Sequence, residues 1–305
     1  MKQRVIFIVG PTAVGKTEAA YLLAKKIKGE IISCDSMQVY RSMDIITSKP
    51  KKLLQKNIPH HMLGVVSPQK PYDVSQYRKE AVIKAKQILK NGRVPIFAGG
   101  TGLYVSILID GIFEAKAQNE GIRSRLYKEA EESGSAYLYE KLKKVDPQAA
   151  GKIHLHDTKR IVRALEVCEV TGEPISKLQG QRKGLSSDYE IKIFALDMDR
   201  DTLYQRIDAR VDKMFASGLV KEVKNLLKLR LSRTAACAIG IRELKGYFSG
   251  KYDIEEARGL IKKNSRNYAK RQLTWFRKDK RIQWIKIKNK QTPQDIARKI
   301  WNALS

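Results

Sequence analysis

Residues 10–17 (GPTAVGKT) could hold a phosphate. Gly10, Gly15, Lys16 and Thr17 match the spacing G-x-x-x-x-G-K-[ST] of a phosphate-binding loop. The glycines let the backbone amides fold around an anion, the lysine adds positive charge, and the threonine hydroxyl can bind Mg²⁺. Nothing in such a loop recognises adenine or counts phosphates. The loop therefore fits a diphosphate as well as a triphosphate.

Two further segments offer a carboxylate and a hydroxyl. Asp35 directly follows a short β-branched run, and Thr101 lies in a Gly-Gly-Thr-Gly turn at residues 99–102. An ATPase needs a metal-binding aspartate at the end of a buried strand, but this turn supplies only a hydroxyl. Asp35 could be a helix N-cap. We favour a functional role because Ser36, Gln38 and Tyr40 follow it, and these groups suit the edge of a planar heterocycle better than a phosphate.

Alternating strands and helices must position these segments. The patterns predict strands at residues 4–9, 30–34, 60–66 and at the start of 94–104, and helices at 17–28 and 74–91. Such alternation indicates an α/β fold with a parallel sheet covered on both faces. Ligands bind beyond the carboxyl ends of parallel strands. Residues 10–17, 35–40 and 99–103 are therefore expected to converge on one pocket.

The pattern changes at about residue 115. Residues 115–189 are polar, helical and poor in strand signals, whereas residues 190–198 and 281–287 again read as strands and a helix follows Pro293. We therefore predict a helical insertion domain at 115–189. The catalytic core would comprise residues 1–114 and 190–305, with basic helices toward the C-terminus.

The charge predicts a polyanionic partner. The formal net charge is +28, and residues 201–305 carry 26 Lys and Arg against 10 Asp and Glu. Residues 261–281 hold nine basic residues and one acid, with Tyr268, Trp275 and Phe276 among them. We expect these aromatic residues mainly to pack and the basic stripe to contact RNA.

Other classes of protein are disfavoured. No apolar run approaches the roughly 20 residues of a membrane span. The three scattered cysteines indicate neither a disulfide framework nor a zinc site, and the adjacent His60 and His61 are expected to be structural. A monomer in a reducing cytoplasm, without a membrane partner, is the expected state.

A family resemblance extends over nearly the whole chain. The segments GPTAVGKT, DSMQVYRSMDI, PHH, GGTGLY, IHLHDTKRIVRALEVCEVTGEP, RIDARVDKM, AIGIREL and NYAKRQLTWFR occur in the order found in bacterial tRNA dimethylallyltransferases, the tRNA isopentenyltransferase family, which they resemble. The resemblance implies a P-loop NTPase-like core. It also implies transfer of a dimethylallyl group from dimethylallyl diphosphate to the exocyclic amine of the adenosine 3′-adjacent to the anticodon in tRNA. The partners would be the tRNA anticodon stem-loop and dimethylallyl diphosphate, with Mg²⁺ as cofactor.

The resemblance also assigns roles to residues. Asp35 would be the general base, Thr101 would contact the bridging oxygen of the leaving group, and Arg210 would neutralise the diphosphate, with Arg206 as runner-up. The diphosphate would bind Gly10, Pro11, Thr12, Ala13, Val14, Gly15, Lys16 and Thr17, and Thr17 would also bind the metal. The tRNA would contact Asp35, Ser36, Met37, Gln38, Thr101, Arg123, Lys159, Arg160, Ile161, Val162, Arg163, Lys270 and Arg271, with Ser36 and Gln38 holding the extruded adenine. A solvated helix face is the competing interpretation for Arg123, Lys159, Arg160 and Arg163.

The chain departs from the family pattern at three positions. Ile46 stands where a glycine is usual, and Cys237 and Ile241 replace a polar and an aromatic residue. These departures bear on the loop near the pocket and on RNA-stem contacts.

Two other functions remain open from the residues alone. A small-molecule kinase could use the same loop, with Asp35 binding an acceptor hydroxyl. A non-catalytic RNA-binding protein could carry a relic loop, although intact Lys16, Thr17 and Asp35 argue against it.

Overall fold

The chain folds into two compact units. The computed structural model describes residues 2–113, 119–288 and 291–304. One unit comprises Met1–Ile109 and Asp188–Ser305, and the other Asp110–Ser187. The second unit begins at 110 and ends at 187, whereas the predicted insertion spanned 115–189.

The first unit is built on a parallel sheet. Among the described residues its strand order is β3-β2-β4-β1-β5-β6, and every neighbouring pair is parallel. The strands are β1 Arg4–Val9, β2 Gly29–Ser33, β3 His60–His61, β4 Val94–Gly99, β5 Glu190–Met198 and β6 Gln283–Ile287. The central strand β1 is apolar and buried from Val5 onward, because helices cover both faces of the sheet. The predicted α/β fold with a P-loop-like core is confirmed.

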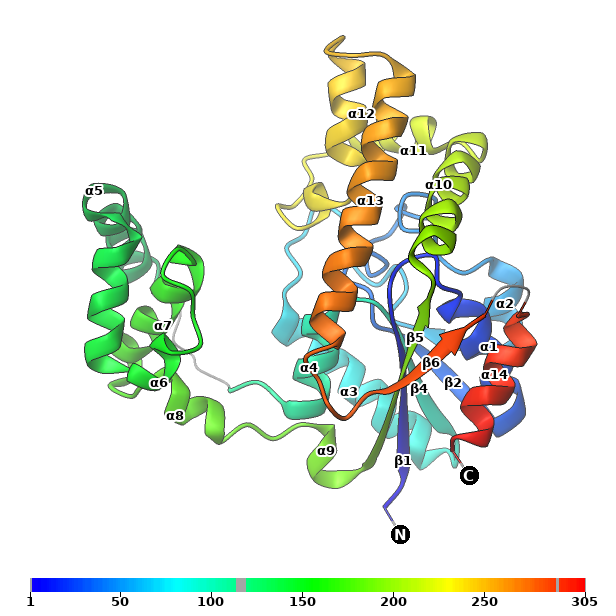
Figure 1. Ribbon diagram of the computed structural model, residues 1–305, viewed down its shortest axis with the longest axis horizontal. Helices are drawn as coiled ribbons and strands as arrows, with labels where there is room; N and C mark the ends of the chain where they lie inside the picture. The colour runs from blue at the N-terminus through cyan, green and yellow to red at the C-terminus, as the bar shows by residue number, and fades with distance from the viewer. Residues whose placement is uncertain (1, 114–118, 289–290, 305) are drawn as a thin grey trace. The chain divides into compact units, whose positions relative to one another are not determined.

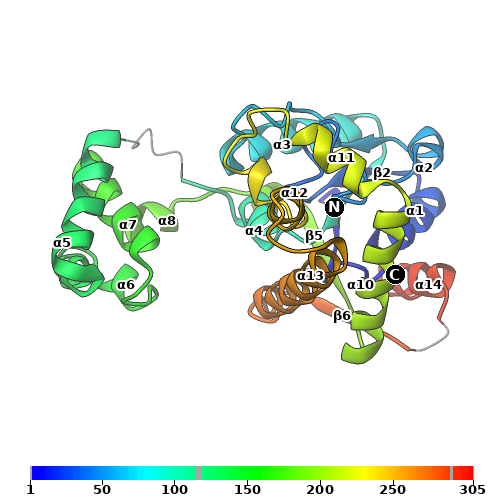
Figure 2. The ribbon, with the colours of Figure 1, turned by 90° about the horizontal axis from the view of Figure 1, so that it is seen from above.

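Helices surround this sheet and extend beyond its carboxyl edge. They are α1 Lys16–Ile27, α2 Lys52–Asn57, α3 Val74–Lys90, α4 Gly102–Asp110, α10 Arg200–Ala216, α11 Leu219–Leu226, the 3₁₀ turn η1 Ala235–Cys237, α12 Ile241–Phe248, α13 Ile254–Phe276 and α14 Pro293–Asn302. α1 and α14 lie side by side on one face of the sheet, and α3 lies on the other (Figures 1 and 2). α10 to α13 rise beyond the carboxyl ends of the strands (Figure 1). That edge is where parallel sheets bind ligands.

One predicted strand is much shorter than expected. Only His60–His61 of the predicted residues 60–66 form β3. Met62 and Gly64 have φ angles of 61° and 59°, which turn the chain out of the extended conformation. Val66 instead forms an isolated parallel bridge with Tyr40, outside the strands of the sheet.

In the described residues, the second unit contains helices and no strand. Its helices are α5 Glu120–Val145, α6 Pro147–Ala150, α7 Thr158–Thr171 and α8 Ile175–Gly180, and α9 Leu185–Asp188 spans its boundary with the first unit. α5 bends at Gly134, whose φ of 81° is non-helical. Leu138 and Leu142 of α5 pack with Ile161 and Leu165 of α7 in a core of its own.

No helix within the described ranges combines the length and apolar character needed to cross a membrane.

Candidate active site

The phosphate-binding loop lies between β1 and α1 at the carboxyl edge of the sheet. Gly10 and Gly15 have φ angles of 138° and 99°, a region that favours glycine. A Cβ atom at Gly10 would lie 2.7 Å from the Leu196 carbonyl oxygen of β5, so the backbone approach itself requires glycine. Lys16 Nζ donates to the Pro11 carbonyl oxygen at 2.6 Å. This hydrogen bond ties Lys16 to the start of its own loop.

The pKa of Lys16 lies near neutral pH. Burial, together with the nearby positive charge of Arg210, lowers the pKa of Lys16 to about 7, although Asp35 and Glu18 act in the opposite direction. A bound anion would favour the charged form. The predicted affinity of this loop for phosphate groups would therefore be linked to the protonation of Lys16.

Asp35 caps a turn with one oxygen and leaves the other open. Its Oδ1 accepts hydrogen bonds from the backbone nitrogens of Met37 at 2.9 Å and Gln38 at 3.4 Å. Its Oδ2 accepts none from the described residues. The structure shows the capping role, and the functional role stays a prediction that is compatible with it, because each concerns a different oxygen.

Thr101 lies against the Asp35 turn, as the predicted convergence of strand ends requires. Its Oγ1 accepts from the Ser36 nitrogen at 3.0 Å and donates to Ser36 Oγ at 3.3 Å. The glycine turn allows this approach, since a Cβ atom at Gly99 would lie 2.0 Å from the Cys34 carbonyl oxygen. The Thr101 hydroxyl must exchange a partner before it can contact a leaving group.

Arg210 joins the phosphate-binding loop from a distant part of the chain. Its Nη1 donates to Thr12 Oγ1 at 2.7 Å, and its Nε donates to Ser48 Oγ at 2.9 Å. Burial lowers the pKa of Arg210, while Asp35 and Glu18 partly offset that effect. Two directed bonds thus fix the guanidinium beside the loop.

Two hollows meet at Arg210. A cavity of about 250 Å³ is lined by polar groups that include Thr12, Asp35, Ser36 and Arg271, and by the side chains of Ile46, Ile207, Val211, Met214, Ala238, Ile239 and Ile261. A larger cleft of about 1190 Å³ contains Lys16 and Thr17, and also Arg206. Arg210 lines both hollows. A diphosphate in the cleft and an apolar group in the cavity could therefore belong to one ligand.

Gln38 does not occupy its predicted position. Its Oε1 accepts from Ser33 Oγ at 2.8 Å, and its Nε2 donates to the carbonyl oxygens of Thr47 and Ser48 at 3.2 and 3.4 Å. Gln38 is absent from the cavity wall, in contrast to Ser36 and Met37. In this arrangement Gln38 holds a loop, and its contact with adenine stays a prediction.

Gln272 is a site residue that the sequence reasoning missed. It is buried in α13, where its Oε1 accepts from the Thr12 nitrogen at 2.8 Å and its Nε2 donates to the Gly100 carbonyl oxygen at 2.9 Å. It thereby ties the phosphate-binding loop to the glycine turn. The sequence did contain one indication of this role. Gln272 shares a helix face with Ala269 and Phe276, and an amide on an apolar face needs buried hydrogen-bond partners.

α13 exposes basic side chains and divides its aromatic residues between core and surface. Lys270 and Arg271 are exposed, and Arg271 also lines the cavity. Phe276 is buried, as expected, whereas Trp275 remains 40% exposed. The basic residues are thus available to a polyanion beside the Asp35 cavity.

Of the six residues of the second unit predicted to contact tRNA, four are accessible to solvent and two are buried. Arg123, Lys159, Arg160 and Arg163 are at least partly exposed, whereas Ile161 and Val162 are buried in the core, where their side chains cannot touch an RNA. Glu166, fully buried, binds Arg123 at 3.0 Å and Arg163 at 2.9 Å. Those two arginines therefore support the fold as well as contributing surface charge.

Glu166→Gln should destabilise the protein by about 1.5–3 kcal/mol, since two charged hydrogen bonds lose their anionic acceptor. Burial would raise the pKa of Glu166, but hydrogen bonds from Arg163, Arg123 and Asn119 bring it below its usual value. The stabilisation is complete above the unfolded pKa and is lost as pH falls through the folded one. Urea unfolding of both proteins, measured from neutral to acidic pH, should show the difference shrinking. Glu140→Gln, on an exposed ion pair, is the control and should show little effect.

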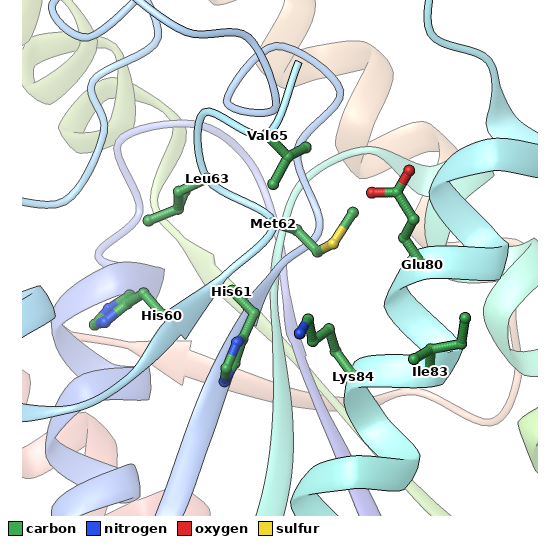
Figure 3. A pocket seen from close by; sticks show the side chains of 8 residues that line it. All are labelled: His60, His61, Met62, Leu63, Val65, Glu80, Ile83 and Lys84. Carbon is green, nitrogen blue, oxygen red and sulfur yellow. The ribbon is translucent and has the colours of Figure 1, made fainter.

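A separate surface pocket lies where β3 and the following turn face α3 (Figure 3). His60 Nδ1 lies 2.7 Å from the Ile58 carbonyl oxygen, and His61 Nε2 lies 2.7 Å from Glu30 Oε2. Both histidines are thus hydrogen-bonded, as the structural interpretation predicted. In the described part of the chain, no cluster of three or more potential metal-ligating side chains is found.

Comparison with protein families gives a direct match. The model of a family described as IPP transferase matches residues 38–279, and one described as isopentenyl transferase matches residues 3–57. A tRNA dimethylallyltransferase of Alkaliphilus oremlandii is 44% identical over 97% of this chain and 96% of that protein. Another, of Carboxydothermus hydrogenoformans, is 46% identical over 98% and 97%.

Two solved structures are similar to this chain over more than nine tenths of its length. A tRNA isopentenylpyrophosphate transferase of Bacillus halodurans superposes with a TM-score of 0.72 at 37% identity, covering 99% of this chain and 97% of that chain. A eukaryotic dimethylallyltransferase acting on tRNA gives a TM-score of 0.79 at 29% identity, covering 93% and 74%.

Proposed function

Because the chain belongs to the IPP transferase family, we propose that it transfers a dimethylallyl group from dimethylallyl diphosphate to tRNA. The acceptor is the exocyclic amine of the adenosine 3′-adjacent to the anticodon, and diphosphate is released. Family membership favours this activity over the kinase and the non-catalytic RNA-binding protein. The end of β4 agrees, since residues 99–102 supply no metal-binding carboxylate.

The observation that carries the proposal is the position of Arg210 between two hollows. On one side lie Lys16 and Thr17, which suit a diphosphate, and on the other lies Asp35 in a partly apolar cavity. The allylic carbon would then sit between its leaving group and the acceptor amine. This arrangement supports an in-line displacement.

Each reacting group has one role in the proposed transfer reaction. The amine lone pair forms the new carbon–nitrogen bond as the carbon–oxygen bond breaks, and the electron pair of that bond leaves with the diphosphate. Asp35 accepts the proton that the nitrogen sheds. Arg210, Lys16 and the loop amides stabilise the charge on the departing diphosphate. Thr101 donates to the bridging oxygen after exchanging its bond to Ser36.

Mg²⁺ fits this site as a partner of the diphosphate. Thr17 lines the cleft beside Lys16 and provides a hydroxyl oxygen. Since Mg²⁺ prefers oxygen ligands and is often held by few protein groups together with substrate phosphates, Thr17 would be its main protein ligand. When bound, the ion neutralises charge on the leaving group.

The RNA would contact both units. Exposed Lys270 and Arg271 on α13 would bind phosphates near the cavity, and Arg123, Lys159, Arg160 and Arg163 support the proposal that residues 115–189 form a tRNA-gripping domain appended to a core of 1–114 and 190–305. We propose that the protein acts in the cytoplasm, where its tRNA substrate occurs. We also propose that it acts as a monomer.

Mass spectrometry tests the function directly. Unmodified tRNA incubated with the protein, dimethylallyl diphosphate and Mg²⁺ should gain one dimethylallyl unit, located by nuclease digestion at the adenosine beside the anticodon. Lys16→Met is the matched control and should give little product. Unchanged tRNA, or ATP hydrolysis at a rate comparable to any transfer, would contradict the proposal.

Binding of inorganic diphosphate should take up a proton through Lys16. Its pKa of about 7 in the free protein leaves it mostly neutral at pH 8, and the anion restores the charged form. Calorimetric titrations at pH 8, in buffers of different ionisation enthalpy, should show wild type taking up close to one proton more than Lys16→Met. Equal proton counts would show that Lys16 keeps one protonation state when the anion binds.

Neutralising Lys270 and Arg271 together should weaken tRNA binding and flatten its salt dependence. Removing one ionic interaction with a phosphate is expected to reduce the slope of log K against log salt concentration by up to about one unit. Filter binding at several salt concentrations measures the slope. Lys86→Gln and Lys90→Gln together, at two exposed positions of α3, form the charge-matched control. An unchanged slope would show that this stripe does not face the RNA.

A further inference from the structure

The carboxylate of Glu222 on α11 is held by three successive backbone amides. Glu222 Oε1 accepts from the nitrogens of Ile45 at 3.1 Å and Ile46 at 2.9 Å, and Oε2 accepts from those of Asp44 at 3.1 Å and Ile45 at 2.9 Å. Consecutive amides that point inward form a concave anion site, here filled by a side chain of the same protein. We call residues 44–48 the amide loop.

The amide loop supplies three elements of the site. Ile46 forms part of the apolar wall of the cavity. Ser48 Oγ accepts from Arg210 Nε at 2.9 Å. The carbonyl oxygens of Thr47 and Ser48 accept from Gln38 in the turn that follows Asp35.

Glu222 itself belongs to neither the cavity wall nor the lining of the cleft. It therefore has no direct route to the substrate. We propose that Glu222 is a positioning residue, which holds the amide loop so that Ser48 fixes Arg210 against the leaving diphosphate and Ile46 closes the cavity. This inference rests on the proposed function, because it assigns Glu222 to the same transfer reaction.

Loss of the carboxylate should act on the rate more than on substrate binding. Without an acceptor, the three amides are left with unmet hydrogen bonds and the loop relaxes toward solvent. Arg210 then keeps its bond to Thr12 but loses the orientation given by Ser48. Removal of a group that orients a metal ligand commonly costs about 10- to 100-fold in activity, and we take the same scale for a group that orients Arg210. We expect kcat of Glu222→Ala to fall by about that factor, with a smaller change in KM for either substrate.

Chemical rescue distinguishes positioning from general support of the fold. Glu222→Ala leaves a vacant amide site that formate can enter, so formate should restore much of the lost kcat. Formamide, similar in size but uncharged, should not. Lys221→Ala, the exposed neighbour on α11, controls for the helix and should keep the wild-type rate in all three conditions.

Hydrogen exchange gives a readout that is independent of turnover. The amides of residues 44–46 should exchange faster in Glu222→Ala and regain protection in formate. If the alanine variant does not fold, Glu222→Gln serves in its place. It keeps the side-chain size and one acceptor oxygen, and it should lose kcat and protection without rescue, since the site stays filled.

The outcomes distinguish the transfer reaction from the positioning role of Glu222. Wild-type protein without transfer would overturn the proposed function, and with it this inference. With wild type active, a variant whose kcat is unchanged, or whose amide protection returns in formate while kcat does not, would overturn the positioning role alone. Lower kcat that formate but not formamide restores, together with amide protection, would support it.

Discussion

Asp35→Asn should lower single-turnover prenyl transfer by roughly a hundred- to ten-thousand-fold, the range expected for loss of a general base. The adenine amine is a poor nucleophile because its lone pair is delocalised into the ring. Its attack on the allylic carbon leaves a positive nitrogen that must shed a proton. Asparagine cannot accept that proton. Rapid-quench assays with saturating enzyme measure the step directly.

The hydrogen bonds of Asp35 indicate that this substitution should leave the local backbone unchanged. Asp35 Oδ1 holds the turn through the nitrogens of Met37 and Gln38, and the amide oxygen of asparagine can keep both bonds. Only the outer oxygen, which accepts no hydrogen bond from a described residue, is replaced by an NH₂ group. Binding of tRNA and of diphosphate should therefore stay near wild type.

A matched control repeats the change at another capping aspartate. Asp73 caps α3 through the nitrogens of Ser75 and Gln76 and lies outside the cavity wall. Asp73→Asn should transfer at the wild-type rate. If Asp35→Asn instead lost Mg²⁺ or diphosphate binding and kept its rate at saturation, Asp35 would be a metal-shell residue and the proton would need another acceptor.

Arg210→Lys should lower the rate of transfer by about a hundred- to a thousandfold, although the charge is kept. Removal of a group aimed at developing charge typically has an effect of that size. The guanidinium is fixed by two bonds at different nitrogens, to Thr12 and Ser48. A lysine has a single nitrogen and cannot reproduce this fork. The loss should fall mainly on kcat, because charge grows on the leaving oxygen only as the bond breaks.

Arg206 provides the comparison. It lies one helical turn before Arg210 on α10 and lines the outer cleft but not the inner cavity. Arg206→Lys should change kcat much less and affect mainly KM for dimethylallyl diphosphate. A larger loss of kcat at Arg206 than at Arg210 would reverse their roles. Kinetics with each substrate varied in turn separates the cases.

The sequence by itself determined the local elements of the core. The phosphate-binding loop, the acid after β2 and the glycine turn after β4 are each a few contiguous residues, so their spacing can be recognised directly. Hydrophobic periodicity predicted β1 and α3 because it depends on neighbouring residues. The strand at 60–66 was predicted too long, because apolar residues alone do not reveal that Met62 adopts a left-handed conformation.

The tertiary structure alone decided which polar groups face the substrate and which support the fold. Arg210 meets Thr12, and Gln272 joins Thr12 to Gly100, across separations of 198, 260 and 172 residues. Periodicity carries no information about such pairs. The same holds for Gln38, whose amide is taken up by its own chain.

The physical reason lies in how polar groups are satisfied. A buried donor or acceptor must find a partner within the fold. The identity of that partner depends on which distant segments pack together, as Glu222 and the amides of residues 44–46 illustrate. Sequence thus specified the chemical groups and the edge of the sheet where they gather. Only packing determined which of their atoms remain free to act on a substrate.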